Sequence, residues 1–293
     1  MFKGTGVAIV TPFHKDGSVD YSSLEKLLNH IINGGIDFVV ALGTTSEAVT
    51  LSNDEKQELM KKVLEITDKR VPVVMGVGGN NTAAVVEQLK STDFSGISGI
   101  LSVAPYYNKP NQRGIYAHFA EIAKNSPLPI ILYNVPGRTS SNISAETCLT
   151  LANDFDNIVA IKEASGDMGQ IMEILQNKPE DFSMLSGDDA LTFPMMTLGA
   201  EGVISVVANA YPAEFSKMVN LLNDQKDLES AKHIHYSLLT FIDLLFADGN
   251  PAGIKAALEI MKIMENNLRL PMVAVTENHF NLLNDFIKNY KQP

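Results

Sequence analysis

The chain has 293 residues, of which 45% are hydrophobic and 19% charged, and its formal net charge is −11. This composition is that of a globular protein, and an acidic balance without a basic cluster argues against nucleic acid and anionic membranes as partners. No apolar run reaches the roughly 18 residues that cross a bilayer, and the first residues lack the charged and apolar regions of a signal peptide.

The single cysteine, Cys148, lies within the helical pattern "SAETCLTLA". One cysteine cannot form a disulfide within the chain. This is typical of proteins from a reducing compartment, so we expect a cytoplasmic protein. We interpret Cys148 as a core residue of a helix rather than as a functional thiol.

Eight short runs rich in β-branched and apolar residues alternate with amphipathic helical patterns. In "YSSLEKLLNHII" the apolar residues recur at helical spacing, and Ser52 and Glu55 have the spacing of a capping box at the start of the next helix. Eight strands that alternate with helices predict an α/β fold, the (β/α)8 TIM barrel. The predicted strands are residues 7–10, 38–42, 71–75, 99–103, 129–133, 158–162, 182–185 and 202–206.

The alternative is an open, doubly wound α/β sheet. Such a sheet would carry a glycine-rich phosphate-binding loop after its first strand, where this sequence reads "TPFHKDGS". The later segment "GVGGNN" lacks the G-x-G-x-x-G spacing, and we interpret it as a turn. The sequence therefore favours the barrel.

The strand pattern ends near residue 225, and three helical patterns follow. We expect a catalytic barrel over residues 1–224 and a three-helix C-terminal domain over residues 225–293, with Pro251 at the start of the second helix. His233 and His235 in the first helix are two positions apart. They should lie on different faces, which argues against a shared metal site.

In a TIM barrel the catalytic residues lie at the C-terminal ends of the strands and in the loops that follow. At these ends we find hydroxyls, phenols, one arginine and one lysine, but no set of metal ligands. Asp188 and Asp189 alone are too few for a metal site, and we interpret them as helix N-caps. The candidates are Thr44 and Thr45 after the second strand, Tyr106 and Tyr107 after the fourth, Tyr133 and Arg138 at the fifth, and Lys162 at the sixth.

Lys162 ends the apolar run in "NIVAIKEASG", where a charged side chain is unusual. Because side chains alternate along a strand, Lys162 should face the barrel interior if Ala160 and Ile158 do. An apolar environment disfavours the ammonium form, and a free amine attacks carbonyl groups to form a Schiff base. The alternative is a lysine that extends to solvent or pairs with Glu163.

A Schiff-base enzyme also needs proton carriers and groups that hold its substrates. The phenols of Tyr133 and Tyr107 can carry protons, and the hydroxyl of Thr44 can bridge them. Thr45 and the backbone N–H groups of "GTTSE" suit a carboxylate, and Arg138 can hold a second carboxylate through two parallel hydrogen bonds. One amine and two anion-binding groups predict two acidic substrates, one of which becomes an enamine.

Several segments together resemble a known family. They are "GTTSE", "PYYNKP", "YNVPGRT", "IKEASGD", "SGDDALTFPMMTLGAEGVISVVAN" and "LRLP", and they extend over essentially the whole chain. The sequence resembles the pyruvate-lysine class I aldolases of the N-acetylneuraminate lyase family, and among these the dihydrodipicolinate synthases. The segment "YNVPGRT" is the most specific, because related lyases generally lack its arginine.

The resemblance implies catalytic roles for four residues. Lys162 is implied to be the Schiff-base lysine for pyruvate, and Tyr133 the general acid and base. Thr44 and Tyr107 are implied to complete a proton relay, with Tyr107 entering from the neighbouring subunit.

The resemblance also implies binding roles. Thr45 is placed at the carboxylate of pyruvate, Arg138 at the carboxylate of aspartate semialdehyde, and Gly187 and Ile204 in the lining of the pocket. Ser46 departs from the family pattern, since many members have glycine there. The change is small and leaves the assignment standing.

The reaction implied by the resemblance is the condensation of pyruvate with L-aspartate 4-semialdehyde to 4-hydroxy-tetrahydrodipicolinate, in lysine and diaminopimelate biosynthesis. Pyruvate joins Lys162 and becomes an enamine, which attacks the aldehyde. The amine of the second substrate then displaces Lys162 and closes the ring. Neither pyridoxal phosphate nor a metal is required, so no cofactor is expected. The resemblance further implies a homotetramer built as a dimer of dimers, and at least a homodimer.

Two alternatives remain open. Another aldolase of the family, such as a sialic acid or keto-sugar-acid lyase, would need hydroxyl partners for a polyol where this chain has Arg138. A non-catalytic relative that binds a keto acid would not need the proton relay of Tyr133, Thr44 and Tyr107 beside Lys162. Assays with a panel of aldehydes would discriminate between these alternatives.

Many members of the family are inhibited by lysine at a cleft between two subunits. Asn80 and Tyr106 match that cleft, but Ala84 stands where sensitive bacterial members carry a glutamate. Asn53 and Lys56 stand where those members tend to have histidines. An alanine cannot accept a hydrogen bond from the ammonium of lysine, so we expect weak or absent inhibition.

Overall fold

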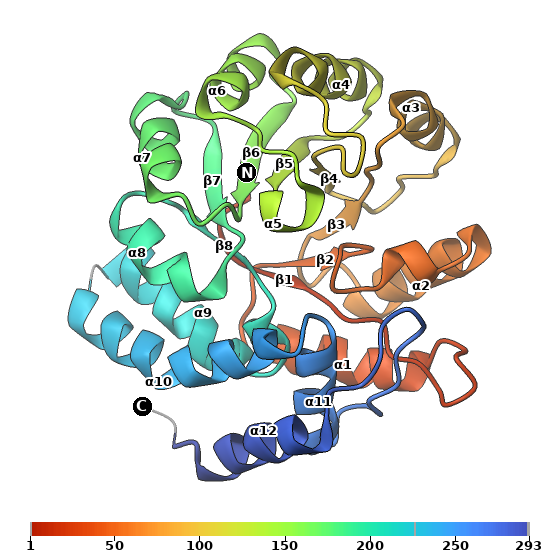
Figure 1. Cartoon of the computed structure of the whole chain (residues 1–293), viewed down its shortest axis with the longest axis vertical. Coiled ribbons are helices and arrows are strands. Elements are labelled where there is room, and N and C mark those ends of the chain that lie inside the picture. The colour runs from red at the N-terminus through yellow and green to blue at the C-terminus, as the bar shows by residue number, and fades with distance from the viewer. Residues whose placement is uncertain (1, 226, 292–293) are drawn as a thin grey trace. The chain divides into compact units, whose positions relative to one another are not determined.

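The computed structural model describes residues 2–225 and 227–291 (Figure 1). Eight strands follow one another around a closed barrel in the order of the chain, which confirms the predicted TIM barrel and excludes the open doubly wound sheet. All eight predicted strands are present, and the largest difference is at the first, which begins at Gly4. The strands are β1 (Gly4–Ala8), β2 (Phe38–Ala41), β3 (Val73–Gly76), β4 (Gly99–Val103), β5 (Ile130–Asn134), β6 (Ile158–Glu163), β7 (Ser183–Ser186) and β8 (Gly202–Ser205).

Most of the helices begin at a Ser, Thr, Asp or Asn whose side chain accepts a hydrogen bond from a backbone N–H of the first turn. Both halves of the capping box predicted from Ser52 and Glu55 are present. The helices are α1 (Tyr21–Asn33), α2 (Asn53–Thr67), α3 (Thr82–Ser91), α4 (Gln112–Asn125), α5 (Pro136–Thr139), α6 (Ala145–Asp154), α7 (Met168–Asn177), α8 (Thr192–Thr197), α9 (Pro212–Asn220), α10 (Leu228–Ala247), α11 (Ala252–Ile260) and α12 (Glu277–Asn289).

The described chain divides into two compact units. The first consists of residues 2–3 with Val73–Ile204 and contains β3 to β7, most of β8, and α3 to α8. Figure 1 shows α4, α6 and α7 on the outer side of strands β4 to β7. These helices contact one another in chain order, and α6 also contacts β6. The strand ends that carry Tyr133 and Lys162 are therefore neighbours within one unit.

The second unit consists of Gly4–Pro72 with the residues from Ser205 onward. Within it, α9 contacts β1, α1 and α10, and the last three helices contact one another. These three are the predicted C-terminal helices, which the structure confirms. Pro251 is the N-cap of α11 rather than its first residue. The proposed division into domains at residue 224 stays a prediction.

The structure tests the interpretation of the two histidines and of the aspartate pair. His233 is exposed on α10 while His235 is buried, which confirms that they lie on different faces, and burial lowers the pKa of His235. Asp188 caps the short helix at Asp189–Leu191 by accepting a hydrogen bond from the N–H of Ala190 at 2.9 Å, as predicted, whereas Asp189 is the first residue of this helix and not its cap. Among the described residues, no group of three or more His, Cys, Asp and Glu side chains could hold a metal ion.

Cys148 lies on the inner face of α6 and is completely buried. Burial raises the pKa of its thiol, and Glu163 adds to that effect. A thiol that stays protonated is a poor nucleophile. The structure therefore confirms the interpretation of Cys148 as a core residue.

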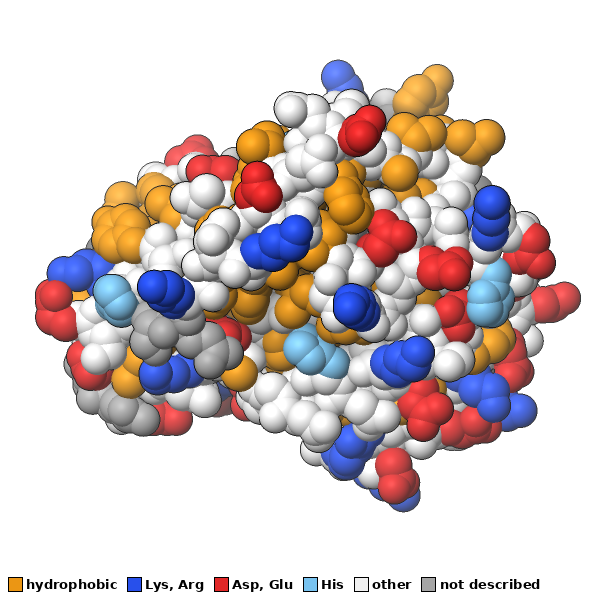
Figure 2. Space-filling view, turned by 90° about the horizontal axis from the view of Figure 1, so that it is seen from below, with side chains coloured by type: hydrophobic (Ala, Val, Ile, Leu, Met, Phe, Trp, Pro, Cys, Tyr) orange, Lys and Arg blue, Asp and Glu red, His pale blue; other side chains and the backbone are white. Residues whose placement is uncertain are grey.

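The surface carries charges of both signs. Figure 2 shows acidic and basic side chains interspersed over one face of the molecule. Several of the exposed pairs lie one helical turn apart, such as Lys62–Glu65 and Lys124–Glu121 at 2.9 Å, and pairs of this kind contribute little to stability. Within residues 2–225 and 227–291, no helix combines the length and the apolarity that a membrane span requires.

Candidate active site

Lys162 is buried at the C-terminal end of β6. After a register shift between Ile130 and Ile131, β5 and β6 pair residue by residue, so that Tyr133 lies directly beside Lys162. Lys162 is only 5% exposed, and the Nζ atom lies 4.4 Å from the centroid of the Tyr133 ring. An aromatic ring rather than a carboxylate therefore faces this amine.

The carboxylate next to Lys162 in sequence is fully engaged elsewhere. Glu163 accepts hydrogen bonds from the side-chain amide of Asn134, from the backbone N–H of Ser165 at 2.7 Å and from the side-chain amide of Gln170 at 3.1 Å. Burial raises the pKa of Glu163, and these hydrogen bonds oppose the shift. None of the ion pairs between described residues includes Lys162. Lys162 thus neither extends to solvent nor pairs with Glu163.

Gly187 makes room for the lysine side chain. A Cβ atom at position 187 would lie 2.7 Å from the Cβ of Ala164 and 3.1 Å from both Cγ and Cε of Lys162. A larger side chain at position 187 would therefore crowd Ala164 and the methylene carbons of Lys162. Gly187 also donates its N–H to the carbonyl of Glu163 at 2.7 Å, which ties the end of β7 to β6.

Ile204 lies on β8, next to β7. It is 1% exposed and follows Val203, which pairs with Ser186. Ile204 is therefore one position beyond this pair, as Gly187 is on β7. The first unit thus brings together Lys162, Tyr133, Gly187 and Ile204 at the ends of four consecutive strands.

Arg138 lies five residues beyond Tyr133 on the short helix α5. Pro136 occupies the first position of this helix, and the backbone N–H of Arg138 donates to the carbonyl of Val135 at 2.9 Å. The residue is exposed. Its side chain is therefore accessible to an anion from solvent.

Tyr107 lies in the loop after β4 and projects outward. Its backbone N–H donates to the carbonyl of Thr139 at 3.4 Å, so the loop adjoins α5. Tyr107 has a left-handed φ of 74° and is 88% exposed. Its phenol is not packed within this chain, although two hydrogen bonds hold the loop that carries it. The side-chain amide of Asn80 donates to the carbonyl of Tyr106 at 3.1 Å, and that of Asn108 donates to the carbonyl of Asn80 at 2.9 Å.

Thr44 and Thr45 lie in the second unit, on the loop after β2. Thr44 is exposed and Thr45 is 3% exposed. The hydroxyl of Thr45 accepts a hydrogen bond from the side-chain amide of Asn250 at 3.2 Å. Sequence reasoning missed Asn250. Its only local signal is a polar residue before Pro251 at a helix start, and the two partners are 205 positions apart.

Ser46, which replaces the glycine of many family members, is accommodated in this loop. Its hydroxyl donates to the carbonyl of Ile9 at 2.6 Å, and its carbonyl accepts a hydrogen bond from the hydroxyl of Thr11 at 2.7 Å. Ser46 is 1% exposed. A buried hydroxyl with a partner costs little, so this departure leaves the loop intact.

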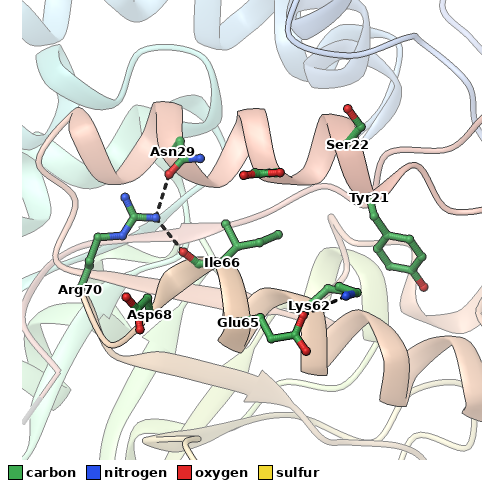
Figure 3. A pocket seen from close by; sticks show the side chains of 9 residues that line it. Tyr21, Ser22, Asn29, Lys62, Glu65, Ile66, Asp68 and Arg70 are labelled. Atoms are coloured by element: carbon green, nitrogen blue, oxygen red, sulfur yellow. Dashed lines mark hydrogen bonds and ion pairs between the residues drawn. The ribbon is translucent and has the colours of Figure 1, made fainter.

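A groove of about 560 Å³ lies on the surface of the second unit between α1 and α2 (Figure 3). Three of its charged side chains have partners: Arg70 donates to the side chain of Asn29 and to the carbonyl of Ile66, and Lys62 pairs with Glu65. None of the predicted site residues lines this groove. We assign it no catalytic role.

Schiff-base chemistry needs an amine kept out of water with a proton carrier beside it. The ends of β5, β6 and β7 supply this combination, which defines an enzyme of the class I aldolase type. The chain belongs to the dihydrodipicolinate synthetase family, whose model matches residues 1–290.

Known relatives resemble the chain over nearly its whole length. It is 51% identical to the 4-hydroxy-tetrahydrodipicolinate synthase of Flavobacterium psychrophilum, over 98% of both chains. It is 54% identical to the enzyme of the same name from Parabacteroides distasonis, over 92% of this chain and 91% of that one. The crystal structure of dihydrodipicolinate synthase from Thermotoga maritima matches with a TM-score of 0.96 and 39% identity over 99% of each chain.

Proposed function

We propose that this chain condenses pyruvate with L-aspartate 4-semialdehyde to form 4-hydroxy-tetrahydrodipicolinate, in the cytoplasm, through a Schiff base at Lys162. The observation that carries the proposal is the buried amine of Lys162. It belongs to none of the ion pairs between described residues, and its Nζ atom lies 4.4 Å from the centroid of the Tyr133 ring. Membership of the dihydrodipicolinate synthetase family supports the choice of substrates.

The chemistry begins at the amine of Lys162. Its free electron pair attacks the ketone carbon of pyruvate, and the resulting carbinolamine loses water to form an iminium. The phenol of Tyr133 delivers the proton that the departing hydroxyl needs. Loss of a methyl proton gives an enamine, whose carbon attacks the aldehyde of the second substrate. The amine of that substrate then displaces Lys162 and closes the ring.

Other residues hold the two substrates. By the family resemblance, Thr45 and the backbone N–H groups of its loop hold the carboxylate of pyruvate, and Thr44 bridges Tyr133 and Tyr107 in the proton relay. Arg138 binds the carboxylate of the semialdehyde through two parallel hydrogen bonds. Gly187 and Ile204 line the pocket without introducing a competing polar group.

A coupled assay tests the proposal. Pyruvate consumption should depend on aspartate semialdehyde, and the product should be the cyclic condensation product. A panel of aldehydes that includes sugar aldehydes provides the comparison. Preferred turnover of a polyol aldehyde would instead identify a lyase for sialic acid or keto-sugar acids, and no turnover of any aldehyde would indicate a keto-acid-binding protein.

We further propose an assembly of at least two chains, and in full a homotetramer, in which Tyr107 completes a neighbour's site. The support is the 88% exposure of Tyr107 on a loop held by hydrogen bonds. Mixing inactive Tyr107→Phe chains with inactive Lys162→Ala chains should restore part of the activity, because one site of each hybrid dimer has all its residues. Absence of rescue after proven subunit exchange would contradict a shared site.

Lysine should inhibit this enzyme weakly or not at all. Asn80 and Tyr106 are joined by a hydrogen bond of 3.1 Å, while Ala84 is exposed near the start of α3 and offers no side-chain acceptor. Losing one charge-assisted hydrogen bond costs about 1.5–3 kcal/mol, or roughly 10- to 150-fold in affinity. Initial rates against lysine at saturating pyruvate measure this. Half-inhibition below the millimolar range would show that another group replaces the missing carboxylate.

A further inference from the structure

A buried ion pair joins the C-terminal segment of the second unit to the loop after β2. Glu47 ends the "GTTSE" segment and is 3% exposed, and its carboxylate pairs with the Nζ atom of Lys255 on α11, which is completely buried. The other carboxylate oxygen of Glu47 accepts a hydrogen bond from the backbone N–H of Arg269 at 3.1 Å. Lys255 and Arg269, both in the chain after the last barrel strand, therefore hold the carboxylate of Glu47.

Arg269 also holds the far end of this loop. Its guanidinium donates to the carbonyl of Thr50 at 2.8 Å, to the carbonyl of Gly17, and to both oxygens of Glu55. Glu55 in turn accepts a hydrogen bond from the backbone N–H of Ser52 at 2.9 Å and so caps α2. The hydrogen bond from Arg269 lowers the pKa of Glu55 to about 2. The carboxylate thus stays charged at neutral pH.

The same two cations lie over one aromatic ring. The Nζ atom of Lys255 is 4.2 Å and the Cζ atom of Arg269 is 4.5 Å from the ring centroid of Phe13. Lys255 also donates to the carbonyl of Asn267 at 2.9 Å. Burial lowers the pKa of Lys255 to about 8, against the opposing effect of Glu47. Lys255 is therefore mostly charged at neutral pH and neutralises Glu47.

The conformation of Glu47 connects this cluster to the substrate-binding threonines. Glu47 has a left-handed backbone, with φ 52° and ψ 35°, and its N–H donates to the carbonyl of Thr44 at 3.1 Å. A residue other than glycine keeps such a conformation only where the surrounding structure fixes it. The anchored carboxylate of Glu47 supplies that restraint at the turn that presents Thr44 and Thr45.

We propose that Lys255 and Arg269 are positioning residues for pyruvate binding: by holding Glu47 they fix the turn, and through it the hydroxyls of Thr44 and Thr45. This role rests on the proposed function of the two threonines. It adds a requirement that the C-terminal segment be docked on the loop before pyruvate is bound in a productive position.

The Lys255→Met variant tests the proposal by removing the charge while keeping the length of the side chain. We expect kcat/KM for pyruvate to fall by about 10- to 100-fold, the scale of a misplacement of about 1 Å. The KM for the semialdehyde should stay unchanged, because Arg138, the residue proposed to bind that substrate, lies on α5 and not in this cluster. An equal rise in both KM values would contradict a role confined to the loop.

The double variant Glu47→Gln/Lys255→Met separates positioning from stability. Lys255→Met alone leaves a buried uncompensated carboxylate, which destabilises the fold, whereas the double variant removes both charges. We expect the double variant to regain thermal stability and to keep a low kcat/KM for pyruvate. A stable double variant with normal pyruvate kinetics would overturn the proposal.

A milder variant keeps the proposal testable if the buried substitutions prevent folding. Arg269→Lys keeps the positive charge but cannot form the paired hydrogen bonds to Glu55. A several-fold fall in kcat/KM for pyruvate, with the semialdehyde KM unchanged, is the expected result. Unchanged pyruvate kinetics in this variant would count against the proposal.

Lys178→Met is the matched control, because it breaks the half-buried Lys178–Glu201 pair, 2.7 Å long, in the other unit. It should lower the melting temperature without changing the pyruvate KM.

Borohydride trapping of pyruvate on the unaltered protein tests the proposed function by itself. If the unaltered protein fails to trap pyruvate at Lys162, the proposed function is wrong. If it traps pyruvate but the variants keep normal pyruvate kinetics, only the positioning role is wrong.

Discussion

Replacing Lys162 with alanine should remove condensation activity and should also prevent sodium borohydride from trapping pyruvate on the protein. Lys162 is 5% exposed, its amine faces the ring of Tyr133, and glycine at position 187 leaves room for its methylene carbons. No neighbouring group can take its place as the nucleophile. The expected loss in kcat is on the order of 10⁴- to 10⁶-fold, the scale of removing a catalytic nucleophile.

Peptide mapping after borohydride treatment tests directly whether Lys162 is the nucleophile. One reduced pyruvate should be found per chain, on the peptide that holds Lys162. Lys124→Gln, at an exposed position of α4, is the matched control and should label like the unaltered protein. Label on Lys109 or Lys255 would show that the nucleophile has been misassigned.

Lys255 is the competing amine that the structure argues against. Burial lowers its pKa to about 8 although the Glu47 carboxylate opposes the shift, so Lys255 is still mostly charged at neutral pH. It is paired with Glu47 and donates to the carbonyl of Asn267. These contacts favour the ammonium form of Lys255, which is not a nucleophile.

Arg138→Ala should impair the reaction with the semialdehyde but not the binding of pyruvate. The variant should still trap pyruvate with borohydride, because Arg138 lies on α5 and not on the strand that carries the amine. Removing the pairing of a guanidinium with a carboxylate should lower kcat/KM for the semialdehyde by about 2–4 kcal/mol, or roughly 30- to 1,000-fold. Because Arg138 is exposed, the melting temperature should change little.

Two further variants sharpen this experiment. Arg138→Lys keeps the charge but loses the paired geometry, so its kcat/KM should lie between those of the alanine variant and the unaltered protein. Arg113→Ala, at an exposed position of α4, should leave both trapping and turnover unchanged. A parallel fall of trapping and turnover in Arg138→Ala would mean that the arginine does not act on the second substrate alone.

The sequence by itself determined the repeating secondary structure, and with it the barrel. Strand and helix periods are local properties, so the eight strands, the three C-terminal helices and the capping box of Ser52 and Glu55 could all be predicted from neighbouring residues. Lys162 could be predicted in the same way, because an amine at the end of an apolar strand is a local and unusual feature. The carboxylate-binding role of Thr45 was inferred from its position after the second strand and from the resemblance, while the roles of Gly187 and Ile204 came from the resemblance alone. All three remain predictions.

Only the tertiary structure decided which distant groups meet. The partner of Glu163 could not be predicted, because Lys162 is its neighbour in sequence while Asn134 and Gln170 bind it in the fold. Asn250 reaches Thr45 over 205 positions, and Arg269 reaches Glu47 over 222. Such contacts have no local signal, since the loop after β2 and the C-terminal segment are brought together by the packing of the intervening chain. The buried carboxylates of Glu47 and Glu163 find their partners in this way, because leaving such a charge unpaired in the interior costs far more than the pairing itself returns.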